Sequence, residues 1–186
     1  MRITPTHVYF FTFKDVFSNW HKSEFEVNGV KFNCMEQYMM YSKAKFFGDE
    51  KVAAEIMLLT DPKDHKAKGR DVTPYNDDAW DAARDKIVIA GLLRKFSQNE
   101  HLLKALLDTG TRRLVEASPY DKLWGCGLKE SDPRILDENN WPGLNKLGNC
   151  LEVAREVLQK RLENKNTVKT EPEIVEKDKK RNRYRP

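Results

Sequence analysis

The stretch that decides the fold runs from residue 25 to residue 44 and reads FEVNGVKFNCMEQYMMYSKA. Its first eight residues alternate around Asn28-Gly29, a dipeptide that favours the tight turn of a β-hairpin. The rest, from about Met35 to Ala44, predicts a helix that follows the hairpin at once. The stretch therefore predicts a β-hairpin that is followed directly by a helix.

Glu36 and Lys43 are the most informative pair in this helix. They stand seven residues apart, so their side chains share one face, which is otherwise mostly apolar. Burying an acid and an amine costs free energy because both lose water. Two interpretations explain the pair: a buried salt bridge, or a catalytic pair at the floor of a pocket. The helix alone leaves both open.

Outside this stretch, the sequence predicts a chain that is mainly helical. The predicted elements are strands at 8–13 and 113–117, helices at about 50–59, 77–96, 99–107 and 147–162, and a helical turn at 64–68. A turn-rich block at 118–148 separates the last strand from the last helix. Loops of this length in compact domains are often functional. We therefore expect a mainly helical single domain with a small β-sheet.

The composition is that of a water-soluble domain. The chain has 186 residues, of which 39% are hydrophobic and 33% are charged. No apolar run approaches the roughly 20 residues that span a bilayer, and the N-terminus lacks the apolar region of a signal peptide. We expect a cytoplasmic protein without membrane contact. Three widely spaced cysteines and four scattered histidines predict neither a disulfide framework nor a metal site.

The positive charge of the chain is concentrated at its C-terminus. Residues 160–186 carry a net charge of +5, whereas the preceding residues carry −1. The body therefore gives no sign of a basic nucleic-acid surface. We expect a folded domain at 1–163 and a basic, disordered tail at 164–186. Such a tail either keeps the protein in solution or makes nonspecific electrostatic contact with nucleic acid.

Two loops offer candidate ligand-binding residues. Ser18, Asn19 and Trp20 follow the first predicted strand, where they are either ordinary turn residues or hydrogen-bonding partners of a ligand. Asp121 and Trp124 stand three residues apart and face the same way in a turn. The indole is suited either to the core or to stacking on a nucleobase.

Glycines and isolated polar residues add weaker candidates. Gly125 would let the backbone approach a ligand closely. Arg70 is either an ordinary surface residue or a bidentate phosphate ligand. Asn145 leads into the last predicted helix, whose N-terminus could bind an anion, although helix entry alone also explains it.

Taken together, these motifs resemble the NADAR family, also called the YbiA-like or riboflavin-intermediate N-glycosidase family. The resemblance runs from about Val8 to Leu158. It is carried by the order and spacing of Phe17-Ser18-Asn19-Trp20, Glu36-Gln37-Tyr38, Lys43-Ala44, Gly69-Arg70, Trp80, Arg84-Asp85, Lys95-Phe96-Ser97-Gln98-Asn99, Leu107-Asp108-Thr109-Gly110, Leu114-Val115-Glu116, Asp121, Trp124-Gly125 and Gly143-Leu144-Asn145-Lys146-Leu147-Gly148.

The resemblance implies a compact α+β domain that hydrolyses an N-glycosidic bond at ribose C1, without metal or cofactor. It implies either of two substrate types, a phosphoribosylamino-pyrimidine of riboflavin synthesis or ADP-ribose attached to guanine, free or in nucleic acid. Breaking a ribosyl C–N bond passes through a cation-like sugar, which needs a carboxylate and an acid for the leaving nitrogen. Glu36 and Asp121 are the available carboxylates.

The resemblance also suggests individual roles. Glu36 would orient the substrate and transfer a proton, and Lys43 would attack the opened sugar as a Schiff-base amine. Trp124 would stack on the base, and Ser18, Asn19 and Arg70 would hold ribose and phosphate groups. The remaining predicted substrate-binding residues are Trp20, Gly125 and Asn145.

Two features lie outside the family pattern. The segment from Cys126 to Asn140 is longer than is typical of the family and borders the expected pocket, so it bears on substrate choice. The basic tail lies beyond the matched region. The alternatives to an enzyme are a non-catalytic module that binds ADP-ribose or a nucleotide, and a nucleic-acid adaptor that acts through its tail.

Overall fold

The hairpin and the helix predicted within residues 25–44 both form in the computed structural model, which describes residues 1–170. Strands β3 (Phe25–Val27) and β4 (Val30–Phe32) pair antiparallel. Asn28 and Gly29 between them have φ angles of 51° and 83°, the left-handed conformation that a two-residue hairpin turn requires. Helix α1 (Met35–Phe46) follows directly. The predictions of a hairpin and an adjoining helix are confirmed.

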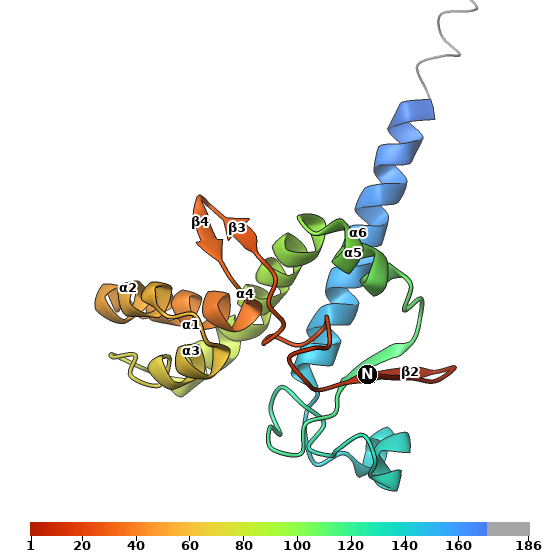
Figure 1. The fold of residues 1–186 in the computed structure, drawn as a ribbon, viewed down its shortest axis with the longest axis horizontal. Coiled ribbons are helices and arrows are strands. Elements are labelled where there is room, and N and C mark those ends of the chain that lie inside the picture. The colour runs from red at the N-terminus through yellow and green to blue at the C-terminus, as the bar shows by residue number, and fades with distance from the viewer. Residues whose placement is uncertain (171–186) are drawn as a thin grey trace, which may run out of the picture.

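Five further helices follow in the described chain: α2 (Glu50–Leu58), α3 (Pro62–Lys68), α4 (Asp77–Ser97), α5 (Glu100–Leu107) and α6 (Lys146–Thr170). Helix α1 packs on α2 and α3, and α4 contacts both α1 and α6. Figure 1 shows α1 to α3 grouped beside the hairpin, whereas α6 is a long rod whose end projects from the body. The mainly helical α+β prediction is confirmed.

Helix α3 is longer than the predicted turn at 64–68, and its N-cap explains why. Asp61 accepts a hydrogen bond from the backbone N–H of Lys63 at 2.8 Å, and Pro62 occupies the first helical position. Proline is favoured there because its missing N–H would have no partner in the first turn. Asp61-Pro62 therefore begins a helix as well as ending the segment before it.

A three-stranded sheet has the order β1-β2-β5 (Figure 1). Strands β1 (Arg2–Ile3) and β2 (His7–Phe10) are antiparallel, whereas β2 and β5 (Arg113–Glu116) are parallel. The parallel register pairs Phe10 with Glu116, so the segments that follow both strands leave the sheet at the same edge.

The first predicted strand, 8–13, is shorter in the structure because the chain turns after Phe10. Asp15 Oδ2 accepts hydrogen bonds from the backbone N–H groups of Phe11 and Thr12, each at 2.9 Å. A carboxylate that binds successive N–H groups stabilises a turn rather than a strand. The loop that carries Ser18 to Trp20 therefore begins at the edge of the sheet.

Alternate residues of the sheet face two apolar clusters. Val8, Phe10 and Leu114 are fully buried in the main core, which also contains residues of α1, α4 and α6. Tyr9 and Val115 face a smaller cluster. This cluster includes Ile135 of a 3₁₀ turn, Pro133–Leu136, in the turn-rich block. That block is therefore packed against the sheet.

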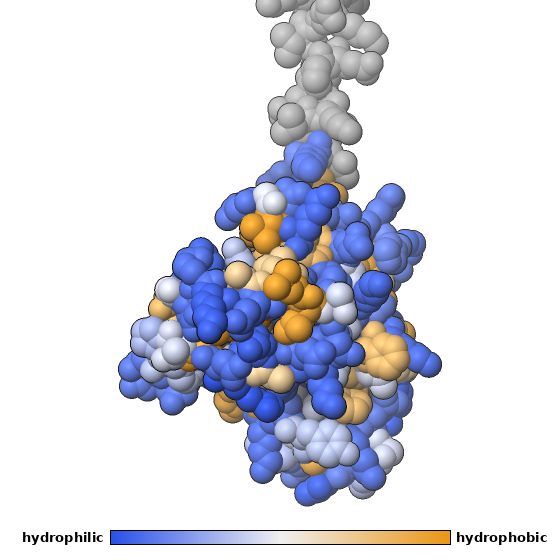
Figure 2. Space-filling model, turned by 60° about the vertical axis from the view of Figure 1, so that its left-hand side comes forward, coloured by the Kyte–Doolittle hydropathy of each residue, from blue (hydrophilic) through white to orange (hydrophobic). Residues whose placement is uncertain are grey.

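The surface of the described residues is mainly hydrophilic on the face that Figure 2 shows, with hydrophobic side chains confined to a few patches. None of the helices within residues 1–170 has the length and apolar character needed to cross a bilayer.

The last helix overlaps the first part of the predicted tail. Helix α6 runs to Thr170, so residues 164–170 are helical where we expected disorder. Side chains from 159 to 165 are exposed, which means that this part of the helix adds nothing to the core. The rest of the predicted tail, 171–186, lies outside the described residues.

Candidate active site

A cavity of about 240 Å³ lies where α1, α3, the end of β5 and two loops meet. Most of the predicted site residues gather here. The cavity is lined by Asn19, Trp20, Glu36, Met39, Met40, Lys43, Lys66, Gly69, Arg70, Glu116, Asp121, Leu123 and Trp124. We call it the catalytic cavity.

Glu36 is buried at the start of α1, with only 3% of its surface exposed. Its backbone N–H donates to the carbonyl oxygen of Asn19 at 3.0 Å, which ties the helix to the loop. Its Oε1 atom has no hydrogen-bond partner. Burial raises the pKa of Glu36 to about 7, against the lowering effects of Lys66 and of a hydrogen bond from the Trp20 side chain. A buried carboxyl oxygen with no partner is poised to bind a ligand.

Glu116 lines the same cavity from the end of β5, although we did not predict it as a site residue. Its Oε2 atom is buried and has no hydrogen-bond partner. Burial raises the pKa of Glu116 to about 8, and the negative charges of Asp121 and Glu36 raise it further. A carboxyl whose pKa is raised in this way holds its proton near neutral pH. The sequence predicted a strand at 113–117 but gave Glu116 no role in the site.

Asp121 and Lys66 form a bridge at the rim of the catalytic cavity. Lys66 Nζ lies 3.3 Å from Asp121 Oδ2. The other carboxyl oxygen of Asp121 accepts hydrogen bonds from the backbone N–H groups of Leu123 and Trp124. Asp121 thus fixes the loop after β5 and brings a cation, Lys66, close to the carboxyls of the cavity. Sequence reasoning missed Lys66 because nothing local links it to residues 50 positions away.

Lys43 lines the cavity together with Glu36, but the two side chains do not form an ion pair: none of the ion pairs in the described chain joins them. Lys43 Nζ donates to the carbonyl oxygen of Gly69 at 2.8 Å and lies 4.2 Å from the ring centroid of Tyr75. Burial lowers the pKa of Lys43, and Asp77 opposes this effect. The salt-bridge interpretation of the helix face therefore has no support.

Three more predicted binding residues line the catalytic cavity besides the indole of Trp124. Asn19 is 5% exposed, and its side-chain oxygen has no hydrogen-bond partner. Trp20 is 36% exposed at the rim, and Arg70 is exposed. Trp124 is 9% exposed, and it both lines the cavity and packs in the main core.

Ser18, Gly125 and Asn145 lie outside the lining of the catalytic cavity. Ser18 Oγ accepts a hydrogen bond from the backbone N–H of Trp20 at 3.1 Å. A Cβ atom at Gly125 would approach the carbonyl oxygen of Asp121 to 2.8 Å, so this glycine permits close packing of the backbone. Asn145 bridges α6 to β5, because it accepts from the N–H of Glu116 and donates to the carbonyl of Leu114.

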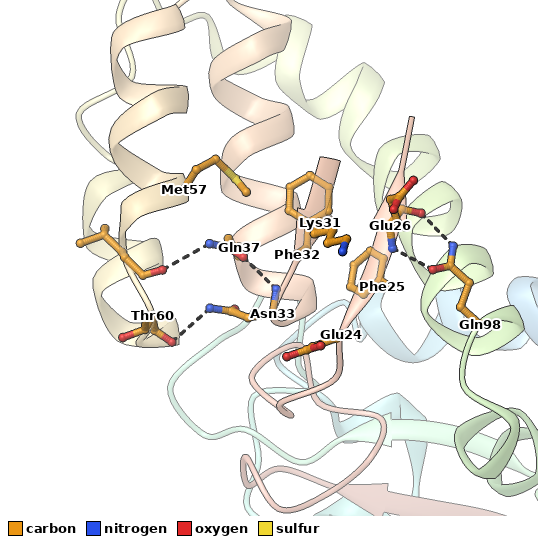
Figure 3. A pocket seen from close by; sticks show the side chains of 11 residues that line it. Glu24, Phe25, Glu26, Lys31, Phe32, Asn33, Gln37, Met57, Thr60 and Gln98 are labelled. Carbon is orange, nitrogen blue, oxygen red and sulfur yellow. Dashed lines mark hydrogen bonds between the residues drawn. The ribbon is translucent and has the colours of Figure 1, made fainter. Parts of the chain in front are cut away.

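A larger cavity of about 490 Å³ lies between the hairpin and α2, away from the predicted site residues (Figure 3). Figure 3 shows that its two glutamines are engaged with the backbone: Gln98 bonds both backbone groups of Glu26, and Gln37 accepts from the N–H of Asn33. These amides hold elements together. The unpaired carboxyl oxygens of Glu36 and Glu116 are instead in the catalytic cavity, which is therefore the better candidate for chemistry.

The arrangement of the catalytic cavity suits acid–base chemistry on a sugar. It places two carboxyls with raised pKa values beside a cation and an apolar floor formed by Met39 and Met40. Within residues 1–170 no group of three or more His, Cys, Asp or Glu side chains is placed to hold a metal ion. One carboxyl can hold a proton while the other is ionised, which is the division of labour that glycoside cleavage uses.

Comparison with known proteins shows what this chain is similar to. A family model described as the NADAR domain matches residues 9–159. N-glycosidase R617 of Acanthamoeba polyphaga mimivirus is 42% identical over 146 residues, which are 76% of this chain and 86% of the relative. Protein irg-1 of Caenorhabditis elegans is 38% identical over 179 residues, which are 88% and 84% of the two chains.

A bacterial relative is similar to this chain both in sequence and in structure. N-glycosidase YbiA of Escherichia coli is 30% identical over 142 residues, which are 76% of this chain and 80% of the relative. The NMR structure of Escherichia coli YbiA superimposes with a TM-score of 0.70 at 28% identity, covering 86% of this chain and 89% of that one.

Proposed function

This chain belongs to the NADAR domain family, and we propose that it is an enzyme, an N-glycosidase that hydrolyses the bond between ribose C1 and a nitrogen of a base. The observation that carries the proposal is the pair of buried, unpaired carboxyl oxygens, Glu36 Oε1 and Glu116 Oε2, in one cavity. The N-glycosidase names of three relatives support the same reaction type.

In this proposal the two carboxyls divide the chemistry. Glu116 has the higher pKa, about 8, so it keeps its proton at neutral pH and gives it to the leaving nitrogen. Glu36 in its ionised form stabilises the positive charge that develops at C1 and accepts a proton from the attacking water. Asp121, which we first proposed as catalytic, acts here mainly by holding Lys66 and the loop that carries Trp124.

Lys43 offers a covalent variant of the same reaction. Its amine lines the catalytic cavity, and burial lowers its pKa, which favours the neutral form that a nucleophile requires. In this variant the ring oxygen gains a proton and its bond to C1 breaks, the neutral Lys43 amine adds to C1, and the C1–N bond to the base then breaks as the base takes up the proton that the amine loses. The resulting imine between Lys43 and C1 is hydrolysed by water, which returns the free amine and releases the sugar. The hydrogen bond from Lys43 to Gly69 would have to break first.

The substrate is a nucleotide-like small molecule in this proposal. The two candidates remain ADP-ribosylated guanine, free or in nucleic acid, and a phosphoribosylamino-pyrimidine of riboflavin synthesis. Trp20 and Trp124 would contact the base, and Arg70 and Lys66 would contact phosphate. We also propose that the protein is located in the cytoplasm.

The test is direct detection of the released base. The full chain is incubated separately with ADP-ribosylated guanosine, a phosphoribosylamino-pyrimidine and NAD, and the products are separated and weighed by mass spectrometry. The proposal expects free base from the first or second compound. Saturable binding by calorimetry with no free base from any of the three would instead indicate a non-catalytic binding module.

A second measurement addresses Lys43. Borohydride reduces an imine to a stable amine, so adding it during turnover should leave a covalent sugar adduct on Lys43, detectable by peptide mass spectrometry. Full activity of Lys43→Ala together with no adduct would eliminate the covalent variant and leave the acid–base reaction.

A further inference from the structure

The amine of Lys43 is held between the end of α3 and the segment that leads into α4. Its Nζ atom donates a hydrogen bond to the carbonyl oxygen of Gly69 at 2.8 Å and lies 4.2 Å from the ring centroid of Tyr75. Gly69 lines the catalytic cavity, whereas Tyr75 does not. The proposed reaction therefore leaves Tyr75 without a role, although its ring contacts the amine that the covalent variant uses.

The ring of Tyr75 is held in place from two sides, although 43% of the residue is exposed. The Phe47 ring packs against it with the centroids 5.1 Å apart and the planes at 66°, an edge-to-face arrangement. The hydroxyl of Tyr75 donates a hydrogen bond to Asp77 Oδ1 at 3.0 Å. The backbone N–H of Thr73 donates to Asp49 Oδ2 at 2.9 Å, which ties this segment to the start of α2. The ring face is therefore fixed where the amine meets it.

An aromatic ring face distinguishes a charged amine from a neutral one. The face carries negative partial charge, so it attracts an ammonium but gains little from an uncharged amine. The carbonyl oxygen of Gly69 also binds a charged donor more strongly than a neutral one. Both contacts therefore hold Lys43 while it is protonated and weaken when it loses its proton. The neutral form is also the one that must leave Gly69 to reach C1 of a sugar.

Charged groups surround Lys43 on α4 and in the lining of the catalytic cavity. Burial lowers the pKa of Lys43, and the negative charge of Asp77 at the start of α4 opposes this effect. Tyr75 contacts Lys43 through its ring face and Asp77 through its hydroxyl, so substitutions that remove the ring and the hydroxyl separately distinguish the two contributions. The charged or titratable residues that line the same cavity as Lys43 are Glu36, Lys66, Arg70, Glu116 and Asp121.

We propose that Tyr75 is a positioning residue for Lys43. Its ring face holds the protonated amine against Gly69 at rest and releases the neutral amine into the catalytic cavity. The inference rests on the covalent variant of the proposed function and deepens it, because it assigns control of the nucleophile to a residue outside the cavity lining.

The experiment measures the pKa of the Lys43 amine in the full chain, without turnover. Acetic anhydride acetylates neutral amines, so the rate at which the Lys43 peptide gains an acetyl group from pH 6 to 11, followed by mass spectrometry, gives that pKa. Tyr75→Leu keeps an apolar side chain over the amine but removes the ring, and we expect the pKa of Lys43 to fall by about 0.5–1. Tyr75→Phe keeps the ring face and should leave the pKa near its wild-type value.

Lys45, which is on the same helix and paired with Glu50, is the internal control, and its acetylation should be the same in all three proteins. Tyr75 is exposed, so both variants should keep the wild-type urea midpoint. An unchanged pKa of Lys43 in Tyr75→Leu, or an equal fall in both variants, would overturn the role of the ring.

A second readout separates this inference from the reaction on which it rests. Cyanoborohydride traps an imine on Lys43 during turnover, and the pH of half-maximal trapping should fall in Tyr75→Leu together with the pKa of the amine. KM should not change, because Tyr75 does not line the catalytic cavity. A pKa of Lys43 that depends on the ring, with no adduct from any substrate, would uphold the hold of Tyr75 on the amine and contradict the covalent variant.

Discussion

Glu36 and Glu116 set the pH dependence that the proposed reaction should show. Activity needs Glu36 ionised and Glu116 protonated, and burial places their pKa values at about 7 and about 8. Activity should therefore fall below pH 7 as Glu36 gains a proton, and above pH 8 as Glu116 loses one. The measurement is kcat/KM for base release from pH 5 to 10. A flat profile across this range would show that these carboxyls do not titrate in catalysis.

The same two residues should make stability depend on pH. A pKa raised by folding means that the folded state keeps protons which the unfolded chain loses above about pH 4.5. The stability that the folded state gains from holding these protons is fully present below that pH and is lost as pH rises through 7 and 8. Glu36→Gln should therefore unfold like the wild type at pH 5 but be more stable at pH 9, by about 2–3 kcal/mol. Urea unfolding at both pH values measures the difference, and equal stability at pH 9 would contradict the raised pKa.

Sequence reasoning found one carboxyl of the proposed pair and missed the other. Glu36 stood out because a charged residue on an apolar helix face is unusual. Glu116 ends a short strand in which one charged residue stands at each end of two apolar ones, and nothing in that local pattern predicts that its side chain lines a cavity. The cavity that it lines also contains Glu36 of α1 and Lys66 of α3, which are 80 and 50 residues away in the sequence. Only the assembled fold brings Lys66 and Glu116 to Glu36.

At the level of elements, α4 supports the site through Lys95. This side chain is fully buried and donates to the carbonyl oxygens of Val16 and Ser18 at 2.8 and 3.3 Å. Lys95→Met should leave the carbonyl oxygen of Val16 without a donor, whereas that of Ser18 still accepts from the N–H of His21 at 3.2 Å. An acceptor left without a donor costs about 1–3 kcal/mol of stability. It should also loosen the loop that presents Trp20, and so lower kcat/KM.

The control for this prediction is Lys86→Met, at an exposed position of the same helix. Activity and urea unfolding are measured for both variants. If Lys95→Met matches Lys86→Met in both, the loop does not depend on the buried ammonium.

Helices and turns were predicted best where neighbouring residues alone determine the backbone conformation. Asn28-Gly29 fixed the hairpin, and the long apolar pattern of α4 was found nearly to its ends. The sheet was predicted less well. The parallel pairing of β2 with β5 joins segments about 100 residues apart, and the turn at Asp15 that shortens β2 is made by a side chain outside the strand.

At the scale of the whole molecule, the end of α6 and the basic tail should be separable from the enzyme. Side chains from 159 to 165 are exposed, so a chain ending at residue 163 should unfold at the same urea concentration as the full chain and act equally on a small substrate. Its binding to single-stranded nucleic acid should weaken, because the removed residues are basic. Fluorescence anisotropy at two salt concentrations measures that binding. Loss of small-substrate activity on truncation would show that the enzyme depends on the removed residues.

The measurement that tests the central claim most directly is release of free base by Glu36→Gln and Glu116→Gln, beside the wild type and Glu24→Gln. Glu24 lines the other cavity in Figure 3 and serves as a carboxyl control. Each variant of the pair should keep the wild-type circular dichroism spectrum and lose about 10²- to 10⁴-fold in kcat, whereas Glu24→Gln should not change. Unaltered kcat in either variant of the pair would contradict a reaction carried by these two carboxyls.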